Sequence, residues 1–420
     1  MKVYKEKINN TDIIFVKTDR FKTNYIKIAF KGEFNKENAG YRVLLNKILK
    51  NSCSKYKTKK EVLMEAYKMY ATSFNISSTV QYKMNITSFS ASFIKQGPIE
   101  IDLTDAVIDY MKEFILHPDI ENNEFNKKVF DEVKRLEKEK IISRYDRKET
   151  YAVDRILEIM GKDSLLSIKP YGSIEDIENI TSKKLYEFYQ NMFKSEEICI
   201  FVIGDYTLKR VKDVVKKINI YNNTSNLDIP FEIKKDEIAI AKQEVLEKKD
   251  IEQSILLRGY RVKEVSYDDK EKYPILCFLL IFGSGPFSRL FETVREKNSL
   301  VYDIDASIDF SYHIMLLYAG IDSKNANKTR ELIEEELNKI KKGIISKNLL
   351  SKAKHTLLRQ LKSLDDSFSR MISFYEMQYF FKNDKTIKDK IKIIKEITIN
   401  DIVKVANNVL FDSEFLLEGR

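Results

Sequence analysis

The sequence predicts an α+β protein built from two homologous halves, each an antiparallel sheet covered on one face by helices. Three observations lead to this fold class. Segments of the first half recur, in the same order, in the second half. Short runs with an apolar side chain at every second position are followed by helical segments that carry one apolar face. Strict alternation of one strand with one helix, which is typical of a parallel sheet, is absent from the sequence.

The internal repeat consists of four weakly similar pairs of segments. The pairs are 25–34 with 253–262, 69–78 with 301–310, 104–115 with 329–340, and 180–193 with 397–410. Each match alone is at the level of chance, but four matches in one order and at nearly one spacing indicate a duplication. We therefore expect an N-terminal half over 1–222, a polar linker over 223–248 and a C-terminal half over 249–420.

The segment 301–310 shows how the strands are recognised. Its larger apolar side chains alternate with Asp or Ser, and they are Tyr302, Ile304, Ala306, Ile308 and Phe310. A period of two marks a strand with one buried face, so the pattern places Tyr302 in register with the core. Between 329 and 361, leucines and isoleucines recur at helical spacing instead, which predicts long amphipathic helices.

Composition excludes several classes of protein. The 420 residues are 43% hydrophobic and 33% charged, which suits a chain with more than one globular domain. Three widely spaced cysteines do not make a disulfide framework, and they favour the reducing cytoplasm. The sequence carries no apolar run long enough to span a bilayer and no recognisable signal peptide, so no membrane partner is expected.

Net charge does not indicate a nucleic-acid-binding protein. The chain has 73 basic and 64 acidic residues, a balance of +9. Clustered Lys and Arg drive binding to phosphates, but here the lysines alternate with acids or isoleucines, as in EVKRLEKEK (132–140). No aromatic RNA-binding signature or helix-turn-helix phrase is present. We therefore expect no nucleic-acid partner.

Common catalytic patterns are also missing. The histidines are His117, His313 and His355, and none has another histidine within metal-ligand spacing. A nucleophile elbow, a P-loop and a Cys/His pair at catalytic spacing are all absent from the sequence. The glycine pair in GSGPF (283–287) is typical of the start of a helix, with Pro286 in the first turn.

One phrase is specific: FGSGPFSRLFETVREKNSLVYDIDASID (282–309). It resembles the C-terminal signature of the pitrilysin/insulinase-type metallopeptidases, the inverzincins, in which a small-residue turn leads to S-R-L-F and then to R-E-K-x-x-L-x-Y. Here Arg295 and Tyr302 occupy the Arg and Tyr positions of that signature. Further similar segments extend the resemblance over nearly the whole chain. It implies a fold like one half of the mitochondrial-processing-peptidase clamshell, which agrees with the repeat.

The same resemblance implies that a zinc motif has been lost. Members of the family carry H-x-x-E-H on a helix of the first half, where the two histidines bind zinc and the glutamate acts as general base. Aligned on the Ala-Gly pair at 39–40, the three motif positions are Val43, Asn46 and Lys47. Valine has no lone pair to donate, asparagine is a poor base, and a lysine ammonium repels a metal ion.

The position of the family's third zinc ligand, a glutamate on a later helix, stays open between two residues. Counting from the similar segment at 113–125 leads to Arg135, and a slip of one helical turn leads to Glu139. With either residue, one carboxylate cannot hold a catalytic zinc, because such sites use three protein ligands. We expect no catalytic residue and no metal in this chain.

Arg295 and Tyr302 are the candidate substrate-binding residues. Some bacterial and organellar relatives work as heterodimers, in which one subunit keeps the zinc motif and its partner supplies the Arg/Tyr pair. Such donors would hydrogen-bond a peptide carbonyl near the scissile bond. Two structural alternatives stay open: Tyr302 as a core residue, and Arg295 in an ion pair with Glu292 or another acid.

The sequence thus predicts a cytoplasmic, non-catalytic, substrate-binding subunit of a heterodimeric zinc metallopeptidase that acts on peptides. Zinc would sit in a homologous partner subunit that retains the motif, and the isolated chain is compatible with a homodimer. The alternative function is a non-proteolytic peptide-binding or scaffold protein that uses the same fold.

Overall fold

The computed structural model describes residues 2–162, 164–222, 227–234 and 240–419. The chain divides into two compact units. The first unit is made of Met1–Ser143 and Ile168–Pro230, and the second of Arg144–Ser167 and Phe231–Arg420. The segment 144–167 therefore packs with the second unit, although the expected boundary placed it in the N-terminal half.

The described strands of the first unit form a six-stranded sheet in the order β1-β2-β8-β3-β5-β4. Neighbours are antiparallel except for the parallel pair β2 and β8. The bounds are β1 Lys2–Ile8, β2 Thr11–Lys17, β3 Thr23–Glu33, β4 Ser73–Gln81, β5 Met84–Ile94 and β8 Glu197–Gly204. A separate two-stranded hairpin joins β6 (Ile120–Glu121) to β7 (Glu124–Phe125).

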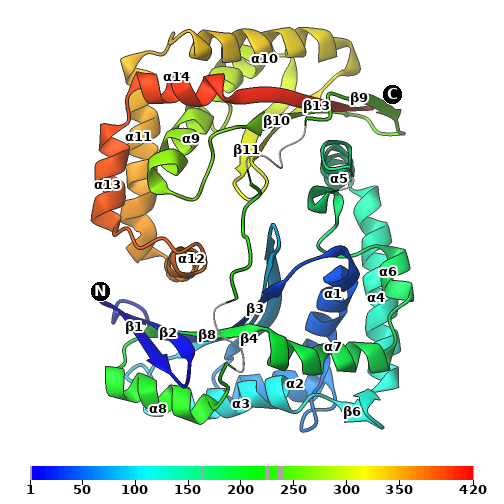
Figure 1. Ribbon diagram of the computed structural model, residues 1–420, viewed down its shortest axis with the longest axis vertical. Coiled ribbons are helices and arrows are strands. Elements are labelled where there is room, and N and C mark those ends of the chain that lie inside the picture. Colours follow the sequence, from blue (N-terminus) through cyan, green and yellow to red (C-terminus); the bar gives the residue numbers. More distant parts are fainter. Residues whose placement is uncertain (1, 163, 223–226, 235–239, 420) are drawn as a thin grey trace. The chain divides into compact units, whose positions relative to one another are not determined.

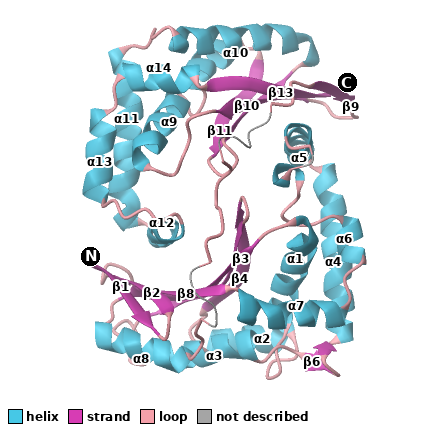
Figure 2. Ribbon diagram, viewed as in Figure 1, coloured by secondary structure: helices cyan, strands magenta, loops and turns pink. Residues whose placement is uncertain are grey.

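The helices of the first unit pack against this sheet and against each other, as Figures 1 and 2 show. They are α1 Lys36–Asn51, α2 Lys59–Lys68, α3 Thr104–Leu116, α4 Lys127–Asp146, α6 Ile174–Glu178, α7 Ser182–Ser195 and α8 Leu208–Ile218. Buried aromatic side chains fill the space between sheet and helices, among them Phe30, Phe89 and Phe114.

The sheet of the second unit repeats five of the six strands of the first, and β1 has no counterpart among its described strands. Its described strands run in the order β9-β13-β10-β12-β11, which matches β2-β8-β3-β5-β4, with β9 and β13 as the parallel pair. The bounds are β9 Glu244–Lys248, β10 Ser254–Val262, β11 Val301–Asp309, β12 Ile314–Ile321 and β13 Val409–Glu418. Segments 25–34 and 253–262 thus fall on equivalent strands, and the predicted α+β fold of two homologous halves is confirmed.

Helices cover one face of this second sheet with a continuous hydrophobic core (Figure 1). The helices and turns of the unit are α5 Lys148–Met160, η1 Leu165–Ser167, α9 Asp269–Phe282, η3 Phe291–Lys297, η4 Ser323–Asn325, α10 Ala326–Lys341, α11 Lys347–Lys362, η5 Ser363–Asp366, α12 Phe368–Phe380, α13 Ile387–Glu396 and α14 Ile399–Asn407. Side chains of α9, α10, α11, α13 and α14 meet those of the strands, with Phe278, Ile304 and Leu317 at the centre.

Helix α5 covers the other face of the second sheet. Ala152, Ile156 and Met160 of this helix pack against a second cluster that includes Phe415 of β13. The helix approaches β10 closely because position 259 is a glycine: a Cβ there would lie 2.2 Å from Met160 Sδ. This face is therefore covered by residues from the first half of the chain.

A buried ion pair anchors the end of α5. The Arg261 guanidinium donates to the Met160 carbonyl over 2.6 Å, and it pairs with Asp412 Oδ2 at 2.6 Å. Both charged residues are buried, and such pairs are stable only when their remaining hydrogen bonds are satisfied. Asp412 meets this condition, since Ser413 Oγ and the Ala241 amide both donate to its Oδ1.

The segment expected as a linker, 223–248, is only partly a connector. Residues 223–226 and 235–239 lie outside the described residues. Its C-terminal end forms strand β9, which pairs in parallel with β13 from Glu244 to Lys248. In the described part of the chain, no helix combines the length and apolar character that a membrane crossing requires.

Candidate functional site

Helix α1 carries the positions of the family's zinc motif. The helix begins at a capping box, in which the Asn35 side chain accepts from the Asn38 amide and the Asn38 side chain accepts from the Asn35 amide. Leu44, Leu45 and Leu49 are buried on its inner face. This fixes the rotation of α1, and with it the directions of positions 43, 46 and 47.

The three motif positions lie in different environments. Val43 is half-buried, Asn46 is buried, and the Lys47 side chain is 44% exposed. Among the described residues, no hydrogen-bond partner faces Asn46 Oδ1. The Lys47 ammonium lies 3.9 Å from Glu137 Oε1 of α4. A cation therefore occupies the space next to the one carboxylate that faces the helix here.

Glu137, rather than either residue expected from counting, is the acid that faces α1. Arg135 and Glu139 are exposed on the outer side of α4, where Arg135 Nη1 and Glu139 Oε1 pair at 2.7 Å. Glu137 is buried and also lies 3.7 Å from the Lys140 ammonium. The sequence holds a signal for this residue that counting missed: Glu137 is the one carboxylate in the apolar stripe of α4, with Phe130, Val133 and Ile141.

These residues do not fit a zinc ion. Tetrahedral zinc needs at least three protein donors, and this site offers one carboxylate beside an ammonium. Across the residues that the structure describes, no group of three His, Cys, Asp or Glu side chains is placed to hold a metal.

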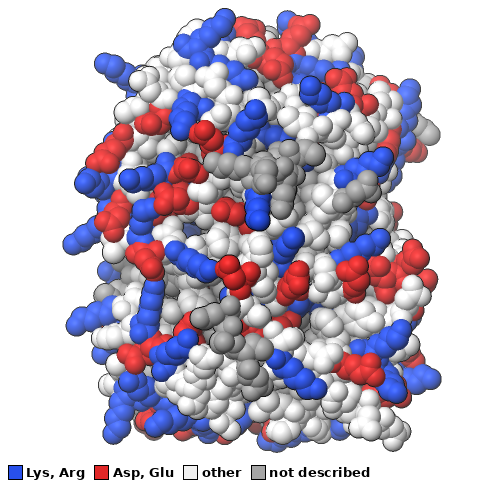
Figure 3. All heavy atoms as spheres, in the orientation of Figure 1, with Lys and Arg blue, Asp and Glu red and all other residues white. Residues whose placement is uncertain are grey.

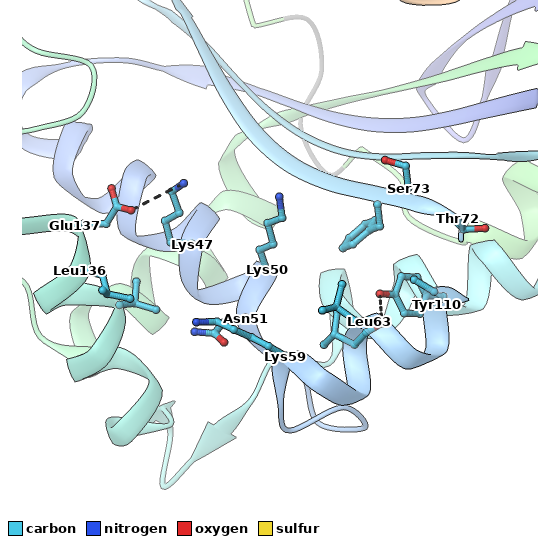
Figure 4. A pocket seen from close by; sticks show the side chains of 14 residues that line it. Lys47, Lys50, Asn51, Lys59, Leu63, Thr72, Ser73, Tyr110, Leu136 and Glu137 are labelled. Atoms are coloured by element: carbon cyan, nitrogen blue, oxygen red, sulfur yellow. Dashed lines mark hydrogen bonds and ion pairs between the residues drawn. The ribbon is translucent and has the colours of Figure 1, made fainter. Parts of the chain in front are cut away.

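A cavity of about 560 Å³ opens beside Lys47, between α1, α2, α4 and the start of β4. Figure 4 shows Lys47 and Lys50 side by side on α1, with Glu137 next to Lys47 and the Leu63 and Tyr110 side chains farther along. The Tyr110 hydroxyl donates to the Val62 carbonyl at 3.1 Å. Burial raises the pKa of Tyr110, so the phenol stays neutral in this lining.

Arg295 lies in the second unit on η3, a π-helix over Phe291–Lys297. Single π-helical turns are rare and are often found at functional sites. The guanidinium carbon lies 4.7 Å from the centroid of the Phe291 ring, and Nε lies 3.9 Å from Glu296 Oε1. Glu292, the acid considered as its partner, pairs with Lys297 at 3.2 Å instead. The Arg295 side chain is 40% exposed and is directed by the Phe291 ring.

Tyr302 is exposed because a β-bulge interrupts the strand. Val301 pairs with Ile321 and Asp303 with Gly320, so Tyr302 has no cross-strand partner in the register of β11 and β12. Both Tyr302 and Asp303 then face solvent, and the alternation of buried residues restarts at Ile304. Tyr302 is 61% exposed. The period of two, which put this ring in register with the core, fails at this point because bulges re-aim side chains.

The Tyr302 hydroxyl donates to Asp322 Oδ1 at 3.2 Å. The negative charge of Asp322, together with this hydrogen bond, raises the pKa of Tyr302. The phenol therefore keeps its proton and remains a donor. Asp322 was not a candidate from the sequence, since it follows β12, twenty residues away in the chain.

Surface charge is mixed around these sites. Figure 3 shows basic and acidic side chains interspersed over the face in view, with no extended area of one sign among the atoms that it describes. This is the arrangement that the alternation of Lys and Glu in the sequence predicts.

Comparisons with known proteins place this geometry in a family. The family model of the peptidase M16 inactive domain matches residues 179–357. The chain is 24% identical over 407 residues to a protein named "Probable inactive metalloprotease YmfF" of Bacillus subtilis, covering 96% of this chain and 95% of that protein. It is 23% identical over 324 residues to the "Uncharacterized zinc protease YmxG" of the same organism, covering 74% and 73%.

A solved structure shares the fold over its full length. A conserved protein of Enterococcus faecalis V583 superposes with a TM-score of 0.90 at 24% identity, covering 100% of this chain and 99% of that chain. The matched family model, the relative that is similar over nearly its whole length, and the residues at positions 43, 46 and 47 agree with one another. The chain is therefore a member of the peptidase M16 family, the pitrilysin/insulinase-type metallopeptidases, that lacks the H-x-x-E-H zinc motif.

Proposed function

We propose that this chain is the non-catalytic, substrate-binding subunit of a heterodimeric zinc metallopeptidase that acts on peptides. A homologous partner subunit with an intact H-x-x-E-H motif supplies the zinc, and this chain supplies Arg295 and Tyr302. The observation that carries the proposal is the bulge at Tyr302, which exposes a large aromatic side chain where strand periodicity would bury it. A tyrosine held at a β-bulge beside a π-helix is placed for contact with another molecule.

The chemistry of the pair suits a peptide carbonyl. The Tyr302 hydroxyl keeps its proton because Asp322 raises its pKa, and to donate to a peptide carbonyl it exchanges the Asp322 carboxylate for that oxygen. A guanidinium stays charged at any pH at which proteins work. Two donors of this kind bind the carbonyl oxygen of an extended peptide, and near a scissile bond they stabilise the negative charge that develops on that oxygen.

Two relatives support a division of labour between subunits. One Bacillus subtilis relative is named as an inactive metalloprotease and another as a zinc protease, so one organism holds both kinds of chain. This chain is similar to the inactive one over nearly its whole length. The proposal gives this chain a zinc-bearing homologue as its partner and a cytoplasmic location, and the isolated subunit is compatible with a homodimer.

A second candidate function is a non-proteolytic peptide-binding or scaffold protein. The cavity beside Lys47 favours it, because this cavity adjoins the former zinc position in the same chain. In that case Arg295 and Tyr302 would bind a ligand, or support the fold, without any effect on hydrolysis.

Reconstitution with a zinc-bearing homologue from the same organism tests the proposal. Hydrolysis of a fluorogenic peptide library by the pair is compared for the wild type, Arg295→Ala and Tyr302→Phe. Loss of one oxyanion-type donor costs about 10²–10³ in turnover, so both variants should lose most activity while the subunits still associate. Arg359→Ala and Tyr70→Phe are matched controls, since both residues are exposed and lie outside η3 and β11.

Full activity of both variants in an intact heterodimer would show that Arg295 and Tyr302 do not contribute to substrate binding or hydrolysis. A chain that neither associates with a zinc-bearing homologue nor raises its activity would favour the scaffold function instead.

A further inference from the structure

The cavity of the first unit has an apolar part and a basic edge. Its volume of about 560 Å³ lies within the range of small-ligand sites in proteins. Every residue that lines it belongs to the first unit. A ligand bound here would therefore be held by this chain alone.

The apolar part is unusually open for a helix-lined wall. All ten residues of α2 are exposed or half-buried, and Leu63, which lines the cavity, is 58% exposed. Phe74 and Tyr110 pack ring against ring at 5.5 Å behind this wall, and Leu136 of α4 closes the opposite side. Large apolar side chains gathered at one concave place, rather than scattered singly, indicate a binding surface.

The basic edge is formed by two lysines on one face of α1. Lys47 and Lys50 are three residues apart, so both side chains point in the same direction from the helix, as Figure 4 shows. Lys47 reaches Glu137 only at 3.9 Å, and Lys50 donates to a neutral group, Asn75 Oδ1, at 2.9 Å. Lys59 also lines the cavity but pairs with Glu132 at 3.4 Å, and Glu137 is the one carboxylate among the lining residues. The excess of positive charge suits an anion.

The backbone next to the cavity favours a peptide over a fatty acid as the anionic ligand. Ser73 and Phe74 line the cavity at the start of β4, and β4 is the edge strand of the six-stranded sheet. An edge strand offers unpaired N–H and C=O groups to an added extended strand. A peptide can use these groups, whereas an acyl chain cannot.

We propose that this cavity binds the C-terminal residue of a peptide. The apolar last side chain packs against Leu63, Tyr110 and Leu136, and the terminal carboxylate lies between the Lys47 and Lys50 ammonium groups. The site thus binds a chain end at the place where the family's zinc motif has been replaced. This inference rests on the second candidate function, which it deepens by naming the part of the peptide that is bound; neither a partner subunit nor Arg295 and Tyr302 take part in it.

The test measures binding of a fluorescein-labelled hexapeptide that ends in leucine to the purified full chain, by fluorescence anisotropy. The same peptide with a C-terminal amide should bind about tenfold more weakly, since it lacks the charged hydrogen-bond acceptor. A peptide that ends in serine should also lose affinity, because it leaves the apolar part unfilled.

Variants locate the site. Lys47→Met and Lys50→Met should each weaken the free-acid peptide by roughly threefold to tenfold and leave the amide unchanged. Lys36→Met is the matched control, because Lys36 is exposed on the first turn of the same helix and does not line the cavity. Glu137→Gln should tighten binding of the acid, since it removes the carboxylate that competes for Lys47.

Equal affinity for acid and amide on the wild-type chain would overturn the proposal, and so would no binding of the acid at millimolar concentration. Binding of laurate to the cavity without binding of the peptide would assign it to a fatty acid instead. The comparison of acid with amide needs no substitution, so it decides the matter even if a variant fails to fold. None of these results involves peptide hydrolysis, and they leave the Arg295 and Tyr302 proposal to its own test.

Discussion

The α1–α4 site belongs to the first unit and the η3–β11 site to the second. The sheets of the two units share an order of five strands, yet the side chains at the two sites differ in charge and exposure. The first keeps a buried carboxylate, Glu137, but pairs it with an ammonium. The second keeps exposed hydrogen-bond donors, with Tyr302 turned out by a bulge and held by Asp322. The comparison teaches that two units with a shared strand order can place very different side chains at their surfaces.

The largest expected effect is a gain of metal. The triple variant Val43→His, Asn46→Glu, Lys47→His restores two histidines one helical turn apart, opposite Glu137. We expect about one tightly held zinc per chain by metal analysis after dialysis, because three protein donors then converge. The wild-type chain should hold far less than one.

Glu137→Gln in the triple-variant background is the control, and it should abolish tight binding. Stoichiometric zinc in the wild type would contradict the alignment of positions 43, 46 and 47. A folded triple variant without zinc would show that α1 and α4 are not aligned as a metal site.

A second prediction concerns the bulge and unfolding free energy. Ile304 is 3% exposed, and Ile304→Ala should cost about 2–5 kcal/mol, as buried Ile-to-Ala changes do. Tyr302→Phe should stay within about 0.5 kcal/mol of the wild type, because the ring is exposed and away from the core. Urea unfolding followed by circular dichroism measures both. A large loss for Tyr302→Phe would mean that this ring belongs to the core after all.

The smallest expected effect is a shift along the pH axis. Asp322 raises the pKa of Tyr302, because its negative charge disfavours the tyrosinate. In Asp322→Asn the charge is gone, so the pKa of Tyr302 falls back toward its ordinary value near 10. The reconstituted pair should then lose activity at a lower alkaline pH than the wild type. If the fall in activity at alkaline pH stays at the same pH in Asp322→Asn, ionisation of Tyr302 does not control the rate.

The fold was predictable because duplication leaves ordered traces in a sequence. Segments 25–34 and 253–262 matched only weakly, yet they fall on the equivalent strands β3 and β10. The exposure of Tyr302 was not predictable from periodicity, because a bulge arises from the pairing of β11 with β12, which a single strand does not contain.

The acid that faces α1 was less predictable than the fold and more predictable than the exposure of Tyr302. Counting from a distant landmark led to Arg135 or Glu139, and both are on the outer face of α4. Helical phase would have led to Glu137, because Val133 and Ile141 fix the buried stripe on either side of it. The buried face of a helix is better predicted from the apolar residues of that helix than by counting residues from a distant aligned segment.

The position of α5 in the sequence has a consequence for folding during synthesis of the chain. Ribosomes add roughly 5–20 residues per second, so on the order of 10 to 50 seconds separate the synthesis of Met160 from that of the last residues of β13. Until then Ile156 and Met160 lack part of the surface against which they pack, because β10 already supplies Ile255 and Leu257 but β13 has yet to supply Phe415 and Leu417. The strands of the first sheet have all been made once β8 has been synthesised. The second sheet, in contrast, packs against α5, a helix that was made before any of its strands. The apolar face of α5 is thus only partly covered until the last strand of the chain has been made.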